Sequence, residues 1–321
     1  MKEINKSIAH IVGAITIGAA AAHTMVPPTP APLAAGEIFG FDTGIMIAFG
    51  TVFGLIGVFL VIFIYTKFLD TKTTFWNPET DESSAGVHID AQEDSSITPP
   101  SFGFALLPIF VPIILILLNT VTNSAMGDAQ PSIFLFLGDK TVALLAGAIA
   151  AYLIGVKCMG KEKAEKAATD SLSSAGIVFL ITGAGGAFSN IITITGVSDA
   201  IADIVSGFAH NVFIVLILSY LVGLLIKQVT GSGTVSALTS MTIMSGVAAS
   251  IALPPVFVAM ACLSGTLFGA TVNDSGFWIV TNISGLSIKG GIKTYTVSEM
   301  LESVFFLILL LIAAGGYMII F

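Results

Sequence analysis

Long apolar stretches follow one another along this chain with little polar sequence between them. About 20 apolar residues in a helix cross the hydrocarbon core of a bilayer, and lipid offers backbone groups no hydrogen-bond partner. The pattern therefore predicts an all-α, polytopic transmembrane protein of the inner (plasma) membrane. The stretches lie near 7–26, 43–67, 101–122, 140–156, 171–195, 202–226, 234–253, 254–272 and 297–321.

Some of these stretches are crowded with Gly, Pro, Ser and Thr, namely 7–26, 171–195 and the pair 234–253 and 254–272. We expect full helices, half-helices or re-entrant hairpins there, since broken helices in membranes line cavities or pack against protein. The first stretch imitates a signal peptide but lacks a small-residue cleavage site with a polar segment behind it. We interpret it as a membrane segment that is retained.

The composition excludes several soluble classes. Only 10% of the 321 residues are charged and 55% are hydrophobic, whereas soluble domains carry about 25% charged residues. A net charge of -8 would repel phosphate backbones, which excludes a nucleic-acid partner. All 12 basic residues are lysines, so bidentate guanidinium contacts are absent. Cys158 and Cys262 are predicted to be packing residues, and the sequence indicates no cofactor and no metal.

The lysine positions predict the orientation, because cytoplasmic loops are enriched in basic residues. Four lysines place the loop 157–170 in the cytoplasm, Lys140 alone disagrees, and Phe321 falls outside. The acidic stretch 70–100 is predicted to be a flexible cytoplasmic linker in which His88 is solvated rather than metal-bound. Counting spans outward from 157–170 puts the other lysines on the same side: Lys2, Lys6, Lys67, Lys72, Lys227, Lys289 and Lys293.

Four polar or glycine-rich clusters interrupt the apolar stretches, and such residues at membrane depth usually face a cavity or a partner helix. The first, His23 to Pro32, has four prolines in six residues and predicts a chain break, with an ordinary extracellular turn as the alternative. The second, Thr182 to Asn190, holds three glycines that suit either close helix packing or an unwound, ligand-binding backbone.

The third and fourth clusters lie toward the C-terminus. Lys227 to Ser236 joins two apolar segments, and its amides and hydroxyls, with a helix beginning near Thr234, suit a carboxylate; a cytoplasmic turn is the alternative. In Thr271 to Trp278, Asp274 would carry a proton, orient a substrate hydroxyl, or cap the next helix. We find no Ser-His-Asp order, no His-Glu-x-x-His and no paired carboxylates in apolar surroundings, so no enzyme is predicted.

In this order the four clusters resemble the gluconate permease (GntP) family of proton-coupled carboxylate symporters. The resemblance covers essentially the whole chain, although 70–100 carries little of it. Thr29 and Ala31 stand where many members have a histidine and a glycine. The matching runs are His23-Thr24 to Pro32, Ile181 to Phe188, Gly231 to Val235, and Asn273 to Trp278, of which the last is the most specific.

The resemblance implies two inverted repeats that meet at a central site, with several leading helices that this chain lacks. Residues 1–69 would end the first repeat, 70–100 would be the cytoplasmic linker, and 101–321 would form the second repeat. The implied partners are a small organic anion, a coupling proton and the lipid bilayer, with a homo-oligomer left open. The implied substrate-binding residues are His23, Thr24, Thr29, Gly183, Gly185, Gly186, Gly231, Ser232, Gly233, Thr234, Asn273, Asp274 and Ser275.

The expected function is transport of gluconate or a related sugar acid by proton symport. The alternatives are a permease for another small organic anion and a truncated, non-transporting remnant. We also expect 231–234 and 273–275 to form one site, because interruptions in lipid are tolerated only where protein or a water-filled cavity satisfies the backbone. Amides, hydroxyls or Lys227 would take the substrate carboxylate, while Asn273 and Asp274 would pair with substrate hydroxyls or take the proton.

Overall fold

The computed structural model describes residues 6–72, 74–82, 99–126, 130–172, 211–248 and 251–320, with 187, 191, 194–196, 200 and 207 between them. Its elements are helices, and six helical segments of the described part are long and apolar enough to cross a membrane. The all-α, polytopic prediction is therefore confirmed. The six segments are Ile8–Phe39, Thr43–Thr71, Phe102–Asn123, Lys140–Met159, Val212–Thr230 and Ile288–Ile320.

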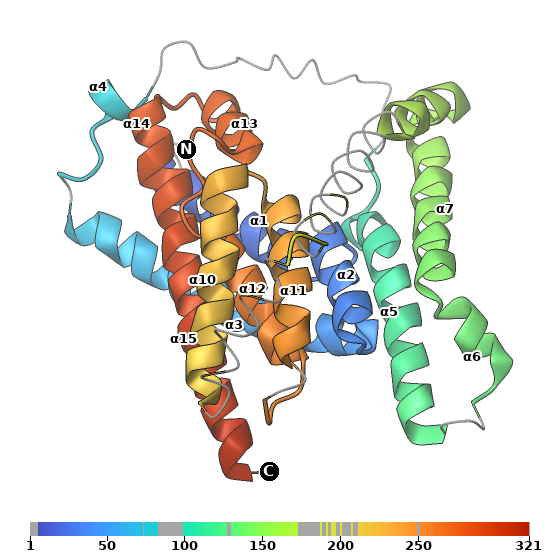
Figure 1. Ribbon diagram of the computed structural model, residues 1–321. Coiled ribbons are helices and arrows are strands. Elements are labelled where there is room, and N and C mark those ends of the chain that lie inside the picture. The colour runs from blue at the N-terminus through green and yellow to red at the C-terminus, as the bar shows by residue number, and fades with distance from the viewer. Residues whose placement is uncertain are drawn as a thin grey trace.

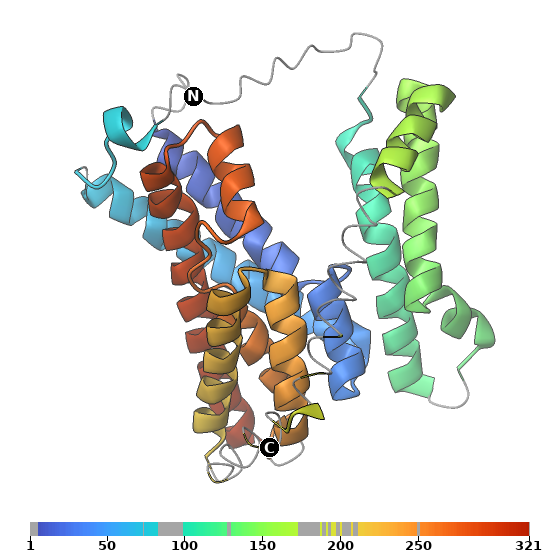
Figure 2. The same ribbon diagram turned by 45° about the horizontal axis from the view of Figure 1, so that its top comes forward.

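The helices form one bundle with a hairpin beside it. Helices α1 (Ile8–Met25), α3 (Thr43–Thr71), α10 (Val212–Thr230), α12 (Val256–Thr266) and α15 (Val297–Ile320) pack against one another. To one side lies the pair α5 (Phe102–Met126) and α7 (Lys140–Met159), joined through α6 (Ser132–Leu137) (Figures 1 and 2). Further helices are α2 (Pro30–Phe39), α4 (Pro78–Asp81), α11 (Gly233–Ala248), α13 (Ser275–Ile283) and α14 (Ile288–Gly291), and residues 161–172 are also helical. The π-helical turn Ile292–Thr296 precedes α15.

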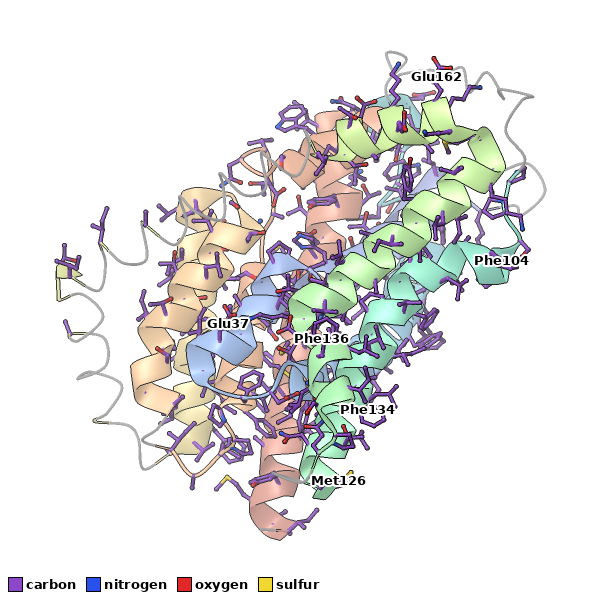
Figure 3. All side chains as sticks on the ribbon, turned by 90° about the vertical axis from the view of Figure 1, so that its right-hand side faces the viewer. Glu37, Phe104, Met126, Phe134, Phe136 and Glu162 are labelled. Atoms are coloured by element: carbon purple, nitrogen blue, oxygen red, sulfur yellow. The ribbon has the colours of Figure 1, made fainter. Side chains whose placement is uncertain are left out.

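The hairpin presents large apolar side chains on its outer face. Phe104 and Phe136 are 54% and 62% exposed and lie on the face turned away from the bundle (Figure 3). Helices α5 and α7 approach each other closely where a Cβ on Gly147 would meet the carbonyl oxygen of Pro108. Exposed apolar residues on long helices of this kind are what a lipid environment favours.

The proline cluster does break the chain, but a new helix begins inside it. Helix α1 ends at Met25, and α2 begins at Pro30 with Thr29 in an extended conformation before it. Proline is tolerated in a first helical turn because the amide of that position has no helical partner anyway. The alternative of an ordinary turn is thus replaced by a broken helix over 8–39.

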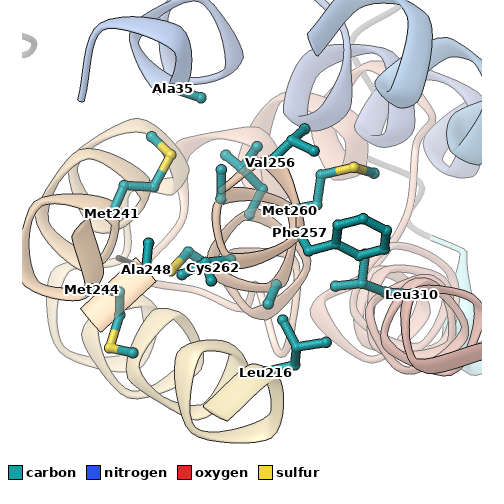
Figure 4. Close-up of a cluster of buried hydrophobic side chains, with 14 of the residues drawn as sticks. Ala35, Leu216, Met241, Met244, Ala248, Val256, Phe257, Met260, Cys262 and Leu310 are labelled. Atoms are coloured by element: carbon teal, nitrogen blue, oxygen red, sulfur yellow. The ribbon is translucent and has the colours of Figure 1, made fainter. Parts of the chain in front are cut away.

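The core of the bundle is built around α12. All eleven of its residues are buried, and methionines of α11 together with Leu216 and Leu310 surround it (Figure 4). Helices α10 and α12 touch backbone to backbone, because a Cβ on Gly223 would meet the carbonyl oxygen of Cys262. Small residues commonly allow such close approach between helices in membranes. The two stretches predicted at 234–253 and 254–272 are accordingly short helices of 16 and 11 residues.

Part of the predicted flexible linker is fixed to the bundle. The side chain of Asp81 is fully buried and pairs with Lys293 at 2.5 Å, while the Ser287 amide donates to the Asp81 carbonyl at 2.9 Å. Burial opposes ionisation of Asp81, but hydrogen bonds from Lys293, the Asn77 amide and Thr80 outweigh it and hold the pKa below its ordinary value. The prediction of a flexible linker over 70–100 is therefore wrong for residues 74–82, which are held against the bundle through Asp81. His88 lies outside the described residues.

Candidate functional site

A cavity of about 400 Å³ opens where several helices begin or end. The last turns of α1 form one wall, the break between α10 and α11 a second, and the break between α12 and α13 a third. The π-helical turn and the first turn of α15 complete it. The lining residues are Ile15, Thr16, Ala19, Ala20, His23, Thr24, Lys227, Ser232, Gly233, Thr234, Thr266, Leu267, Asp274, Ser275, Gly276, Ile279, Val280, Tyr295 and Glu299.

An ion pair holds two of the helix breaks together. The Lys227 ammonium pairs with the Asp274 carboxylate and donates to the Gly231 carbonyl at 3.1 Å. The side chains of Lys227 and Asp274 are only 3% and 13% exposed. Asp274 also accepts from the Gly276 amide at 2.6 Å, so it caps α13 while it faces the cavity. Of the roles that the sequence left open for Asp274, the structure shows the helix cap; Asp274 also lines the cavity, and its part in proton or substrate binding stays a prediction.

The break between α10 and α11 is shaped by glycine and serine. Gly231 ends α10 in the left-handed region at φ 69°, and a Cβ there would meet the carbonyl oxygen of Asn273. Ser232 precedes α11, and its hydroxyl accepts from the Val235 amide at 3.4 Å. Helix α11 begins at Gly233, which confirms the predicted start near Thr234. The helix therefore directs its amino-terminal end at the cavity, an end that favours negative charge.

The structure brings together seven of the predicted substrate-binding residues, from three of the four clusters: His23, Thr24, Ser232, Gly233, Thr234, Asp274 and Ser275. Three others do not line the cavity. Thr29 donates to the Val26 carbonyl at 2.8 Å between α1 and α2, Gly231 packs on Asn273, and Asn273 donates to the Gln228 carbonyl at 3.2 Å. Gly183, Gly185 and Gly186 lie outside the described residues.

The sequence analysis missed two buried carboxylates. Glu299 lines the cavity and is 5% exposed, and Glu302, one turn further along α15, is 0% exposed. The statement that no paired carboxylates occur in apolar surroundings is therefore wrong. Their spacing of three residues at the start of the last apolar stretch puts both on one helical face, and that signal was present in the sequence. Tyr295 and Thr16, which also line the cavity, gave no comparable signal.

The site combines one strong cation with several acceptors and hydroxyls. Of the described lining residues, Lys227 is the lysine, His23 the histidine, and Asp274 and Glu299 the carboxylates. Within the described ranges, no group of three or more His, Cys, Asp or Glu side chains is arranged to hold a metal ion. The arrangement suits a small polar molecule that carries a carboxylate and hydrogen-bonding groups.

A membrane-spanning helical bundle whose chain breaks meet at one polar cavity has the architecture of a solute transporter. The comparisons with known proteins agree with this class. The sequence profile of the GntP family permease matches residues 1–315. The chain belongs to the GntP permease family and is a multi-pass inner-membrane protein.

Similar curated proteins include permeases that are named for different substrates. An uncharacterized permease of Haemophilus influenzae is 30% identical over 89% of this chain and 60% of its own length. A high-affinity gluconate transporter of Escherichia coli is 27% identical over 92% of this chain and 66% of its length. A D-serine transporter, DsdX, of Escherichia coli is 28% identical over 94% and 67%. The chain thus spans less than two thirds of the first two relatives. No solved structure matches it.

Proposed function

We propose that this protein moves a small organic anion, gluconate or a related sugar acid, across the inner membrane in symport with protons. The observation that carries the proposal is the cavity of about 400 Å³ at the helix breaks, which holds a buried lysine and the amino-terminal end of α11. A cavity of this size falls within the usual range for small-molecule sites. Gluconate transporters among the relatives support the choice of substrate.

The carboxylate of the substrate would bind near Lys227 and the first turn of α11. Ser232 and the first residues of that helix line the cavity, and a helix amino terminus adds favourable potential. Because Lys227 already pairs with Asp274, the substrate would share or displace that contact. The substrate hydroxyls would pair with Asp274, Ser275 and Thr24.

An amino acid is the second candidate substrate. Asp274 and Glu299 both line the cavity and together offer carboxylates to an ammonium group. D-serine transporters occur among the relatives. Competition of unlabelled D-serine against labelled gluconate in a binding assay separates the two candidates, because only the true substrate class competes at low concentration.

Uptake into proteoliposomes tests transport and coupling. The purified chain should accumulate labelled gluconate when an inward proton gradient is imposed, and a protonophore should abolish the accumulation. Uptake that persists at full rate after the gradient has collapsed would refute proton symport. A folded protein that neither binds nor transports any small anion would refute the whole proposal and favour the non-transporting alternative.

Two serines, one just before α11 and one within it, test where the substrate binds. Ser232→Ala removes the hydroxyl of a residue that lines the cavity, and loss of one hydrogen bond in a dry site costs about 1 to 3 kcal/mol, so affinity should fall about tenfold or more. Ser245→Ala is the matched control, because Ser245 only donates to the Thr242 carbonyl at 2.8 Å within the helix. Equal affinity in both variants would exclude Ser232 from the site.

A further inference from the structure

Glu302 is a buried acid for which the described part of the chain offers no hydrogen-bond partner. It is 0% exposed, and neither of its carboxylate oxygens has a hydrogen-bond partner among the described residues. The polar residues around it on α15 are satisfied. Ser303 shares a hydrogen bond with the Tyr220 hydroxyl at 2.9 Å and lies 2.7 Å from the Ser264 carbonyl, and Ser298 donates to the Tyr295 carbonyl at 3.0 Å.

Each lysine on the helices that pack against α15 is engaged elsewhere within the part of the chain that the structure describes. Lys227 pairs with Asp274, and Lys293 pairs with Asp81 at 2.5 Å. The other titratable groups on these elements are His10 and His23 on α1, Tyr65, Lys67 and Asp70 on α3, Tyr220 on α10, Cys262 on α12 and Tyr295 on the π-helical turn. His10 pairs with Asp70 at 3.1 Å, and Lys67 is exposed over the Phe63 ring.

An ionised Glu302 would be expensive in this position. A charge in a protein interior without a partner costs several kcal/mol, and the neutral acid avoids most of that cost. The neutral acid is therefore the form that the surroundings of Glu302 accept. A proton held there also has a route to the cavity, because Glu299 lies one turn earlier on the same face of α15 and lines the cavity.

We infer that Glu302 holds the coupling proton and exchanges it with the cavity through Glu299. This inference rests on the proposed transport function and names the residue that couples it to protons. Asp274, the carrier that the sequence offered, is instead occupied by Lys227. An anion bound beside Glu299 makes the electrostatic potential around this end of α15 more negative, which favours retention of the proton on Glu302. Proton and substrate then strengthen each other's binding, and such reciprocal coupling is the thermodynamic basis of symport.

Infrared difference spectroscopy of the purified chain, titrated with pH, tests the inference directly. The parental protein should show the carbonyl band of a protonated carboxylic acid at neutral pH, and Glu302→Gln should lack it. Glu37→Gln is the control, because Glu37 is 64% exposed beside Lys140 and its loss should leave the band unchanged. A parental protein without the band, or a band that survives Glu302→Gln, overturns the inference.

Transport measurements separate the coupling role from the proposed function itself. Glu302→Gln mimics the neutral acid, so it should bind gluconate and catalyse exchange of internal for external substrate, yet lose accumulation driven by a proton gradient. Accumulation at the parental level in this variant overturns the inference. A parental chain that binds no anion refutes the proposed function, while the infrared band still reports on Glu302.

A second variant keeps the test decisive if Glu302→Gln does not fold. Glu299→Gln removes the connection to the cavity but retains Glu302. The protonated-carboxyl band should persist in Glu299→Gln, and its response to a rapid pH jump should slow relative to the parental protein. Loss of the band in this variant, or an unchanged response, overturns the assignment of the proton to Glu302 by way of Glu299.

Discussion

Asp274→Asn should destabilise the protein by about 3 to 5 kcal/mol, the usual effect of removing one partner from a buried ion pair. The substitution leaves the Lys227 ammonium, whose side chain is 3% exposed, with the Gly231 carbonyl at 3.1 Å as its remaining contact. Asparagine caps helices about as well as aspartate, so the loss measures the ion pair rather than the cap.

Lys227→Met should have a smaller effect, about 1 to 3 kcal/mol. The Asp274 carboxylate that it strands is 13% exposed and still accepts from the Gly276 amide at 2.6 Å, where the start of α13 favours a negative charge. The double variant carries neither charge. It should therefore be more stable than Asp274→Asn alone, which is the signature of direct coupling between neighbours.

Apparent melting temperatures of the four proteins in one detergent, followed by size-exclusion chromatography of the soluble fraction, measure this cycle. Lys6→Met is the comparison, because Lys6 and Asp70 form an exposed pair, 42% and 51% exposed, and surface pairs contribute little. Additive losses in the double variant, or single variants that melt like the parental protein, would show that the two side chains are not paired in the folded state.

Three further outcomes are expected. Gly231→Ala should lower the melting temperature and the affinity for gluconate, because Gly231 has φ 69° and a Cβ there meets the Asn273 carbonyl. In the control Gly246→Ala the new Cβ meets nothing within 4 Å, so both quantities should stay close to the parental values. Because the pKa of Asp81 is lowered in the folded protein, its charge stabilises the fold at neutral pH. This stabilisation is lost as the pH falls from the ordinary pKa of an aspartate through the lower pKa of folded Asp81. The melting temperature should therefore decline less toward acid pH in Asp81→Asn than in the parental protein. In intact cells, a cysteine in 157–170 should be shielded from an impermeant thiol reagent and one in 123–127 should be labelled; the reverse pattern would refute the orientation.

The long helices were predictable because apolar runs of sufficient length have few alternatives in lipid. The runs at 43–67 and 101–122 correspond to α3 and α5, each extended by a few residues at its C-terminal end. Helix α2 was not foreseen, since its prolines were interpreted only as breakers. The sequence did contain the relevant signal, a threonine followed by Pro30 at a helical first position.

The site was predictable only where its residues interrupt an apolar run. Ser232 and Asp274 stood out for this reason, and the structure places both at one cavity; their role in binding remains a prediction. The pairing of Lys227 with Asp274 joins residues 47 positions apart, which no local pattern specifies. The spacing of Glu299 and Glu302 was visible in the sequence, but the lack of a hydrogen-bond partner for Glu302 among the described residues is a property of the packed bundle.

The complete burial of α12 has a consequence for how the protein is made. A helix of 11 residues is about 16 Å long, roughly half the hydrocarbon thickness, and every one of its residues is covered by other protein segments. Helix α12 is therefore too short and too well covered to be released into lipid as an independent spanning helix. Helix α12 can pack fully only after α15, which is synthesised later, has entered the membrane. The core of the bundle is therefore complete only once α15 is in place.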